Sequence, residues 1–272
     1  MQIKILEKKE NILRFYMSGL RPQIANGLRR MMIAEVPTMA IDDVIMVENN
    51  SPLRDEMIAH RLGLIPLKTD LSYATRTLCD CQSDLGCSKC SVTLTLEAGA
   101  PDGARNVYSK ELKSSDSDVV PVSGDIPILK LAQGQHIRLE AYARLGTGGE
   151  HAKWQPVSVS AYKYAPLIKV DPEKCNACKE CLKSCPKGVF GMKDNRIVIL
   201  DQDKCDICRL CLKSCPKGSV TIEAEKDAYI YNIESTGALP PETMVEKALE
   251  ILLEKTEDFE EQVSLIRKEE KT

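Results

Sequence analysis

The sequence is poor in aromatic side chains and has no long apolar segment. Phe, Trp and Tyr make up 4% of the 272 residues, which leaves few platforms on which the bases of a single-stranded nucleic acid could stack. No window approaches the ~18 consecutive apolar residues of a membrane span, and the N-terminal MQIKILEKKE lacks the apolar run of a signal peptide. We therefore expect a cytoplasmic protein without a membrane contact.

Basic residues are not in excess, and familiar catalytic motifs are missing. The formal charge of −3 at pH 7 argues against direct nucleic-acid binding by the chain alone, because nonspecific duplex binding needs a basic face. There is no Walker A loop, and GTGGEH at 146–151 lacks the third glycine of a dinucleotide site. His60, His136 and His151 belong to no nucleophilic signature and are interpreted as structural. The sequence therefore predicts no catalytic residues.

Cysteine, in contrast, is abundant, and eight of the twelve cysteines form a repeated block. The spacing C-x2-C-x2-C-x3-C-P occupies residues 175–186 and returns 30 residues later at 205–216. In a reducing compartment such cysteines indicate metal ligands rather than disulfides, and this spacing is typical of [4Fe-4S] centres. Zinc is the weaker alternative, because zinc sites use two CxxC pairs across a longer loop.

The fourth cysteine of each set points away from its own run, and in two-cluster ferredoxins it binds the other cluster. We therefore predict two [4Fe-4S] clusters with crossed ligands. Few apolar residues flank these loops, so the clusters are expected to be part of the fold; the spacing leaves electron transfer and a purely structural role both open. Cluster 1 is assigned Cys175, Cys178, Cys181 and Cys215, and cluster 2 is assigned Cys205, Cys208, Cys211 and Cys185.

The other four cysteines lie in one loop, CDCQSDLGCSKC. Their C-x-C and C-x2-C pairs suit a tetrahedral structural zinc. The alternative is a surface loop of free or redox-active thiols. No His or carboxylate pattern suggests an open catalytic position, so we favour structural zinc. The predicted ligands are Cys79, Cys81, Cys87 and Cys90.

Apolar periodicity and turn residues predict the remaining elements. Two short strands are expected within 2–17, then a helix from Pro22 that Pro37 ends, and a strand at 40–48. From about 49 to 165 the pattern predicts only short strands and turns, among them 92–98 and two strands within 127–146. Residues 114–118 are expected to form a solvated loop and 166–174 a linker, while a strand at 227–237 precedes a long C-terminal helix.

That last helix carries apolar residues at spacings of three and four, which marks a surface for another helix. Burying six such side chains would contribute on the order of 10 kcal/mol before entropy is subtracted. The helix is therefore expected to pack either within the chain or against a partner subunit. We call these residues the C-terminal seam: Val245, Leu249, Leu252, Phe259, Val263 and Ile266.

Residues 26–62 read NGLRRMMIAEVPTMAIDDVIMVENNSPLRDEMIAHRL. This stretch resembles the D subunit of archaeal RNA polymerase, whose relatives are the bacterial α subunit's N-terminal domain and a eukaryotic counterpart. The similarity continues at 134–157 and in NIESTGALPPE before the last helix, so it covers most of the chain. Some members of this family carry a ferredoxin-like insertion in this place, and the loop at 79–90 is similar to one in the eukaryotic counterpart. The matching positions are Asn26, Leu28, Arg29, Arg30, Ala40, Val44, Asn49, Ser51, Asp55, Glu56, Ala59, Arg61 and Leu62.

The resemblance implies an α+β fold in three parts. Residues 1–48 and 225–272 would form a discontinuous α-subunit-like dimerisation domain. Residues 49–165 would form a β-rich insert domain that contains the zinc-like loop 79–90, and residues 166–224 an inserted ferredoxin-like domain.

The resemblance also implies a scaffold that makes no chemical step. In this family the subunit pairs with the smaller subunit L, and the platform recruits subunits N and P and then the large catalytic subunits. The NADFDGD aspartates that hold magnesium in the large subunit are absent here. Arg29 and Arg30 would be contacts for the large subunits or solvated helix charges. The implied interface comprises the C-terminal seam together with Ile24, Leu28, Arg29, Arg30 and Met31.

Two further hypotheses accompany this one. A ferredoxin-type electron carrier fused to a β-rich module could serve an oxidoreductase, but it leaves residues 26–62 and the C-terminal seam unexplained. Clusters that sense oxygen or iron and gate assembly are compatible with the scaffold, because a small domain can lose roughly 10 kcal/mol or more when its structural metal leaves.

Overall fold

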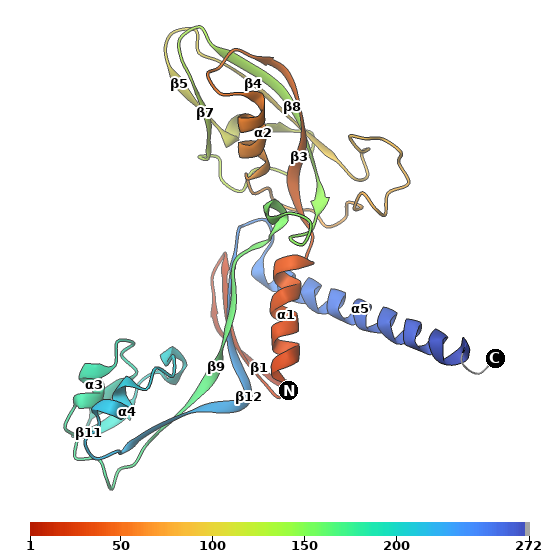
Figure 1. The fold of residues 1–272 in the computed structure, drawn as a ribbon. Helices are drawn as coiled ribbons and strands as arrows, with labels where there is room; N and C mark the ends of the chain where they lie inside the picture. The colour runs from red at the N-terminus through yellow and green to blue at the C-terminus, as the bar shows by residue number, and fades with distance from the viewer. Residues whose placement is uncertain (270–272) are drawn as a thin grey trace. The chain divides into compact units, whose positions relative to one another are not determined.

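The computed structural model describes residues 1–269, and the chain divides into two compact units. Unit 1 comprises Met1–Lys9, Leu13–Asn26 and Ala161–Asn232. Unit 2 comprises Glu10–Ile12, Gly27–Ser160 and the chain from Ile233 onward. Helices and antiparallel sheets are combined (Figure 1), so the predicted α+β class is confirmed. The three-part domain division stays a prediction.

A four-stranded sheet has the strand order β1-β2-β12-β9. Its strands are β1 (Gln2–Lys8), β2 (Ile12–Ser18), β12 (Val220–Ser235) and β9 (Val157–Val170). β1 and β2 are the predicted N-terminal strands, paired antiparallel. Leu13, Phe15 and Met17 alternate along β2 and are buried, as the period of a strand requires. Phe15 stacks on Tyr231 with ring centroids 4.9 Å apart.

β9 corrects one expectation. The sequence predicts a linker from Pro166 to Lys174, but β9 continues through Pro166 to Val170. β9 is the last strand in the sheet order, and an edge strand tolerates proline because one row of its N–H groups needs no partner strand. The segment with the repeated cysteines is therefore held between two neighbouring strands instead of on a linker.

Between β9 and β12, unit 1 contains only short elements. They are α3 (Glu180–Ser184), β10 (Phe190–Lys193), β11 (Arg196–Ile199), the 3-10 turn η3 (Gln202–Lys204) and α4 (Leu210–Ser214). α3 and α4 lie side by side (Figure 1). Cysteines make up three of the eight buried core residues, so the apolar core of this segment is small. That core consists of Ile168, Cys181, Val189, Phe190, Cys205, Cys211, Val220 and Ile222.

Unit 2 contains a second four-stranded sheet, of order β3-β8-β4-β6. Its strands are β3 (Thr38–Asn49), β8 (His136–Gly146), β4 (Val92–Gly99) and β6 (Lys113–Ser114). The strands β5 (Arg105–Tyr108) and β7 (Pro127–Leu131) form a two-stranded ladder, and η1 (Ser109–Glu111) and η2 (Ala152–Trp154) are 3-10 turns. The strands predicted at 40–48, 92–98 and within 127–146 are confirmed.

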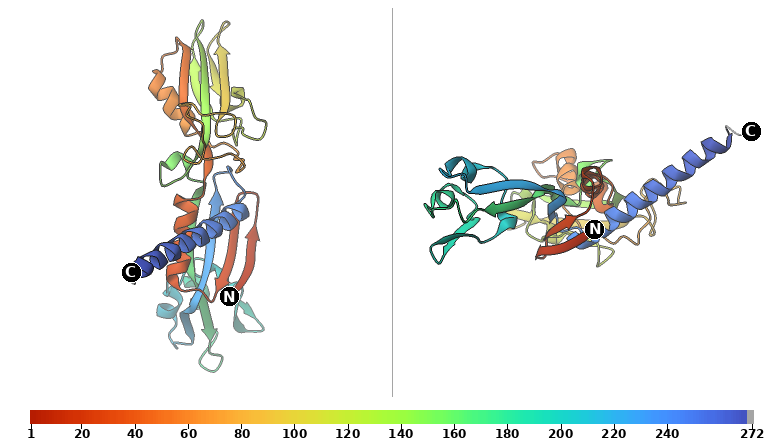
Figure 2. Two further views of the ribbon diagram at one scale, coloured as in Figure 1. Left: turned by 90° about the vertical axis from the view of Figure 1, so that its right-hand side faces the viewer. Right: turned by 90° about the horizontal axis from the view of Figure 1, so that it is seen from below.

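α2 (Asp55–Gly63) was not predicted, so the expectation of only strands and turns between 49 and 165 is wrong there. The helix lies against the β3 end of the sheet (Figure 2). The sequence contains the features of a helix start, but the helix has only nine residues. Acidic Asp55 and Glu56 lie in its first turn, where the helix dipole favours them. Ile58 and Leu62, one turn apart, are both fully buried.

The two predicted terminal helices are confirmed as α1 (Pro22–Ala34) and α5 (Pro241–Glu269). α1 buries Ala25, Leu28 and Met32 on one face. α5 is continuous through 29 residues. Within residues 1–269 no helix has both the length and the apolar character needed to cross a membrane.

Gly148 explains the glycine-rich segment that does not match a nucleotide site. A Cβ at Gly148 would collide with the backbone carbonyl of Ile33 at the end of α1. The N–H of Gly149 donates to the carbonyl of Ala34 at 2.8 Å. These glycines therefore let the segment after β8 approach the backbone of α1.

We expect Gly148→Ala to lower the free energy of unfolding by about 1–3 kcal/mol. The added methyl group would clash with backbone atoms of Ile33, which cannot move aside as the end of a flexible side chain could. Gly27→Ala is the control: nothing lies within 4 Å of its Cβ position in α1, and alanine inside a helix should stabilise by about 0.5–1 kcal/mol. Thermal unfolding followed by circular dichroism measures both. A Gly148→Ala chain as stable as the wild type would contradict the assignment.

Candidate metal centres and partner surface

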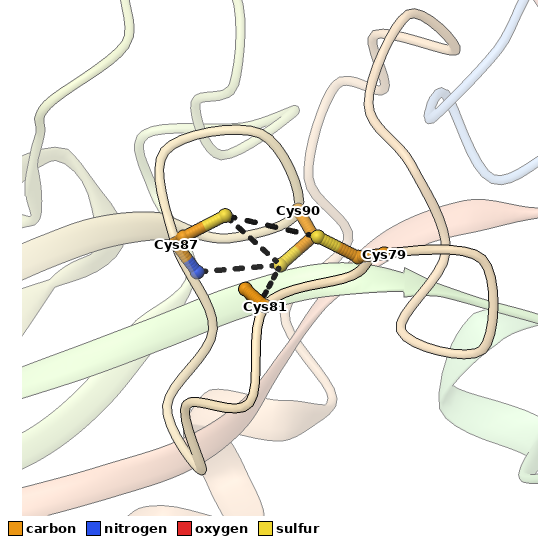
Figure 3. Close-up of side chains that lie close together, drawn as sticks. All are labelled: Cys79, Cys81, Cys87 and Cys90. Atoms are coloured by element: carbon orange, nitrogen blue, oxygen red, sulfur yellow. Dashed lines mark hydrogen bonds between the residues drawn. The ribbon is translucent and has the colours of Figure 1, made fainter.

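The four cysteines of the loop between α2 and β4 converge on one point (Figure 3). Their sulfur atoms all lie within 4.8 Å of one another. The Sγ–Sγ distances are 3.7 Å for Cys79–Cys87, 3.5 Å for Cys81–Cys90 and 3.8 Å for Cys87–Cys90. Zn–S bonds of about 2.3 Å in a tetrahedron place the sulfurs about 3.8 Å apart. The donor set and its spacing therefore fit a zinc ion.

A tight turn positions the second pair of thiols. The N–H groups of Cys90 and Ser91 both donate to the carbonyl of Cys87, at 2.9 and 2.8 Å. The backbone N–H of Lys89 donates to the Cys87 sulfur and lowers the pKa of Cys87 to about 7, whereas burial raises the pKa of Cys90 to about 12. Metal binding at this loop would therefore displace a proton from Cys90, because only thiolates bind the ion.

The histidines do not join a metal centre in the described chain. Among residues 1–269 the Cys79–Cys90 set is the one group of three or more His, Cys, Asp or Glu ligands that lies this close together. His151 Nδ1 accepts from the N–H of Lys153 at 3.0 Å and caps η2. His136 Nε2 lies 3.2 Å from Glu48. Both have structural contacts of the kind that the sequence predicts.

In each repeated cysteine run, two non-glycine residues adopt the left-handed conformation. Their φ angles are +54° at Ala177 and +67° at Lys179, then +54° at Ile207 and +61° at Arg209. Each such residue costs roughly 1–2 kcal/mol relative to the right-handed form. Left-handed residues in a tight loop direct backbone N–H groups into a concavity that binds anions, including iron–sulfur clusters. The backbone and the thiols of both loops therefore fit a cluster.

Hydrogen bonds to sulfur support this interpretation. The N–H of Ile207 donates to Cys205 Sγ at 3.4 Å. The N–H of Ser219 donates to Cys215 Sγ at 3.3 Å, and the Ser219 hydroxyl lies at the same distance. The hydroxyl of Ser219 lowers the pKa of Cys215. Such donors stabilise a thiolate and tune the metal that it binds.

The charges around the buried thiols show which cysteines are neighbours. Burial raises the pKa of Cys211 to about 11, and the charges of Cys185, Cys205 and Cys208 raise it further. Cys185 belongs to the first run in the sequence, yet it lies within electrostatic reach of the second run. For Cys181 in the first run, the charges that raise the pKa come from Cys175 and Cys178 of the same run, so the crossed assignment of ligands stays a prediction.

The described chain covers only the first turns of α5. Met244 and Ala248 are fully buried, although the sequence analysis did not name them. The C-terminal seam instead faces outward: Leu249 is 47%, Phe259 68% and Ile266 57% exposed. Its other members, Val245, Leu252 and Val263, are half-buried. Three of the six seam residues are therefore exposed apolar side chains, and the described chain covers the other three only in part.

The predicted interface residues of α1 divide into two groups. Ile24 is 46% exposed, Arg30 is exposed, and Arg29 and Met31 are half-buried. Leu28 is only 2% exposed. Leu28 is therefore a core residue of this chain and has no surface left for a partner.

Sequence comparison places the chain among known proteins. Residues 41–172 match the family described as the RNA polymerase Rpb3/RpoA insert domain, and residues 174–220 match the 4Fe-4S dicluster domain. The DNA-directed RNA polymerase subunit Rpo3 of Archaeoglobus fulgidus is 44% identical over 95% of this chain and 96% of its own length. The chain belongs to the Rpo3 family of DNA-directed RNA polymerase subunits.

Other members of the Rpo3 family match over a similar length. Rpo3 of Pyrococcus horikoshii is 40% identical over 95% of this chain and 96% of its own length. The RNA polymerase II subunit rpb3 of Dictyostelium discoideum is 38% identical over 97% of this chain and 95% of its own length. The resemblance seen in residues 26–62 is confirmed, and the match to the dicluster domain supports iron–sulfur binding. An electron carrier is not favoured, since the cluster match covers only 174–220.

Proposed function

We propose that this chain is a non-catalytic assembly subunit of a DNA-dependent RNA polymerase. The observation that carries the proposal is the exposed C-terminal seam in a member of the Rpo3 family. A long helix with apolar residues three and four apart is suited to pairing with a second helix. Large apolar patches exposed on one chain mark interaction sites.

The proposed first partner is the small subunit L, which covers the C-terminal seam and the exposed face of α1. Ile24, Gly27 and Met31 lie on that face at spacings of three and four, and nothing lies within 4 Å of a Cβ at Gly27. A glycine inside a helix permits a close approach of another backbone. Subunits N and P and then the large catalytic subunits bind the resulting platform, with Arg29 and Arg30 as candidate contacts.

Catalysis is assigned to the large subunits. The chain supplies no catalytic residue of its own, binds no nucleic acid alone and works in the cytoplasm. Residues 1–48 with 225–272 are proposed as the dimerisation domain, residues 49–165 as the insert domain and residues 166–224 as the ferredoxin-like domain. The metals stabilise these parts: one structural zinc at Cys79–Cys90 and two [4Fe-4S] clusters with the crossed ligands given above.

The pairing is tested by co-purification with subunit L from cells grown without oxygen. The double variant Leu249→Glu, Phe259→Glu should weaken pairing at least about 30-fold, because losing even one residue that anchors an interface costs about 2 kcal/mol or more. Glu254→Gln with Glu257→Gln on the same helix is the control and should pair normally. Normal pairing of the seam variant would contradict the proposed interface.

A variant that lacks cluster ligands, tested in the same assay, separates the binding of subunit L from a role of the clusters in assembly. Cys178→Ser with Cys208→Ser should unfold the cluster segment of unit 1 but leave subunit L bound, because α5 belongs to unit 2. Loss of subunit L would show that the parts are not separable. Undiminished assembly of the whole polymerase would remove the hypothesis that the clusters gate assembly.

The zinc assignment predicts that Cys90→Ser abolishes zinc binding while the iron content is unchanged. Cys90 is buried and completes the four-sulfur set, and a structural zinc requires all four ligands. Metal analysis of the purified protein measures both metals. Ser88→Ala in the same loop is the control, and a Cys90→Ser chain that keeps its zinc would refute the site.

The crossed ligands can be tested in a chain that lacks three ligands of cluster 2 through Cys205→Ser, Cys208→Ser and Cys211→Ser. In that chain, the iron content should depend on Cys215 and not on Cys185. Cluster 1 remains in that chain. Adding Cys215→Ser should then abolish its iron, whereas adding Cys185→Ser should have little effect, because the fourth cysteine of each set binds the other cluster. Iron analysis and electron paramagnetic resonance measure the result, and the reverse response would establish uncrossed ligands.

A further inference from the structure

The two cysteine runs share one spacing, but their surroundings differ. Near the second run, Lys163 Nζ donates to the carbonyl of Cys205 at 2.9 Å and to Asp206 Oδ1 at 2.8 Å. Lys187 Nζ lies 2.9 Å from Asp206 Oδ2. Asp206 therefore joins β9 to the loop of Cys205 and to the segment that follows Cys185. We call Lys163, Asp206 and Lys187 the Asp206 clamp.

The first run lacks the carboxylate of this clamp. Asn176 stands 30 residues before Asp206 and offers a neutral amide in the equivalent place. Cys175, Asn176 and Ala177 instead line a cleft of about 600 Å³, together with Val170 and Arg196 among others. Cys175 is half-buried, whereas its counterpart Cys205 is buried. Small solutes can therefore reach cluster 1 beside Cys175.

The opposite end of the first site is better held. Cys215, the proposed fourth ligand of cluster 1, receives the N–H and the hydroxyl of Ser219, whose counterpart 30 residues earlier is Val189. Valine has no hydroxyl to offer Cys185. The Cys175 end of the first site, where the cleft lies, therefore has fewer such contacts than the Cys215 end.

We propose that cluster 1 is an exchangeable centre, from which a small iron-chelating ligand removes iron through the cleft beside Cys175, and that cluster 2 is a permanent centre held by the Asp206 clamp. This inference rests on the crossed ligands proposed above. The step is ligand substitution: donor atoms of the chelator replace the Cys175 thiolate, which takes a proton from water. Substitution would continue at the other three thiolates, so that all four cysteines of the first site become free and each takes a proton from water. The iron would leave with the chelator in the oxidation states that it already has and the sulfide would leave protonated, so no electron acceptor is needed.

Timed alkylation of the cluster-loaded complex with subunit L tests the order of release. An excess of a chelator that binds both ferrous and ferric iron is added under argon, samples are alkylated with iodoacetamide, and the modified cysteines are read by peptide mass spectrometry. Cys178 and Cys208 are both exposed, so they form an internal pair whose alkylation reports cluster loss rather than access. We expect Cys178 to be modified about five-fold faster than Cys208, which corresponds to the ~1 kcal/mol of a favourable exposed ion pair.

Asp206→Asn gives the second site the amide that the first site has. It should accelerate the modification of Cys208 about five-fold and leave that of Cys178 unchanged. Asp194→Asn is the control, since Asp194 is exposed in the β10–β11 turn and asparagine tolerates its left-handed φ of +49°. Equal rates at Cys178 and Cys208 in the wild type, or release at Cys208 first, would overturn the inference. Iron for fewer than two clusters before the chelator is added would instead refute the ligand assignment on which it rests.

Discussion

The pairing of β9 with β12 is the constraint on which the cluster-bearing segment depends. The chain leaves the sheet after Val170 and returns at Val220, and the two strands are neighbours in the sheet. Aromatic packing reinforces the pair, because Tyr162 lies edge-on to Tyr229 with ring centroids 5.3 Å apart. Once neighbouring strands hold both ends, a long insertion between them adds little entropy cost, since that cost grows only slowly with loop length. A metal-binding segment can thus be accommodated there without disturbing the rest of the sheet.

In the cysteine-rich segment, cysteine side chains take the place in the core that aliphatic side chains have in the rest of the chain. The sheet of β3, β8 and β4 has a continuous apolar core in which residues such as Leu94 and Leu139 are almost fully buried. The segment between β9 and β12 has too few apolar residues for such a core, and its buried cysteines occupy the centre. Small folds of this kind depend on staples. The cysteine blocks therefore agree with the proposed scaffold, in which bound metals would hold these loops in place.

Features set by local spacing could be predicted from the sequence, and features set by tertiary context could not. The alternation of residues 92–98 predicts a strand, and the three- and four-residue spacing of apolar residues predicts the helix α5. The thiols of Cys79 and Cys90 converge as their spacing predicts. The linker predicted from Pro166 is wrong because β9 can contain a proline only through its position at the edge of the sheet. No local sequence pattern shows that position. The burial of Leu28 and of Met244 depends likewise on which helix face the chain covers. The left-handed φ angles fall on ordinary residues such as Ala177 and Ile207, so no local sequence pattern predicts them.

The two cysteine runs show why identical ligand spacing does not make identical sites. Ligand spacing selects the metal, whereas the surrounding hydrogen bonds and charges determine how firmly it is held. Asp171 and Ser219 connect the first site to the sheet: the N–H of Asp171 donates to the carbonyl of Ser219 at 2.8 Å, and the carbonyl of Asp171 accepts from the N–H of Cys175 at 3.1 Å. Ser219 in turn donates to Cys215. Two proposed ligands of cluster 1 are thus anchored where β9 and β12 meet. A change in that cluster would therefore act on the point at which the insertion joins the sheet. The second site is joined to β9 through Lys163 instead.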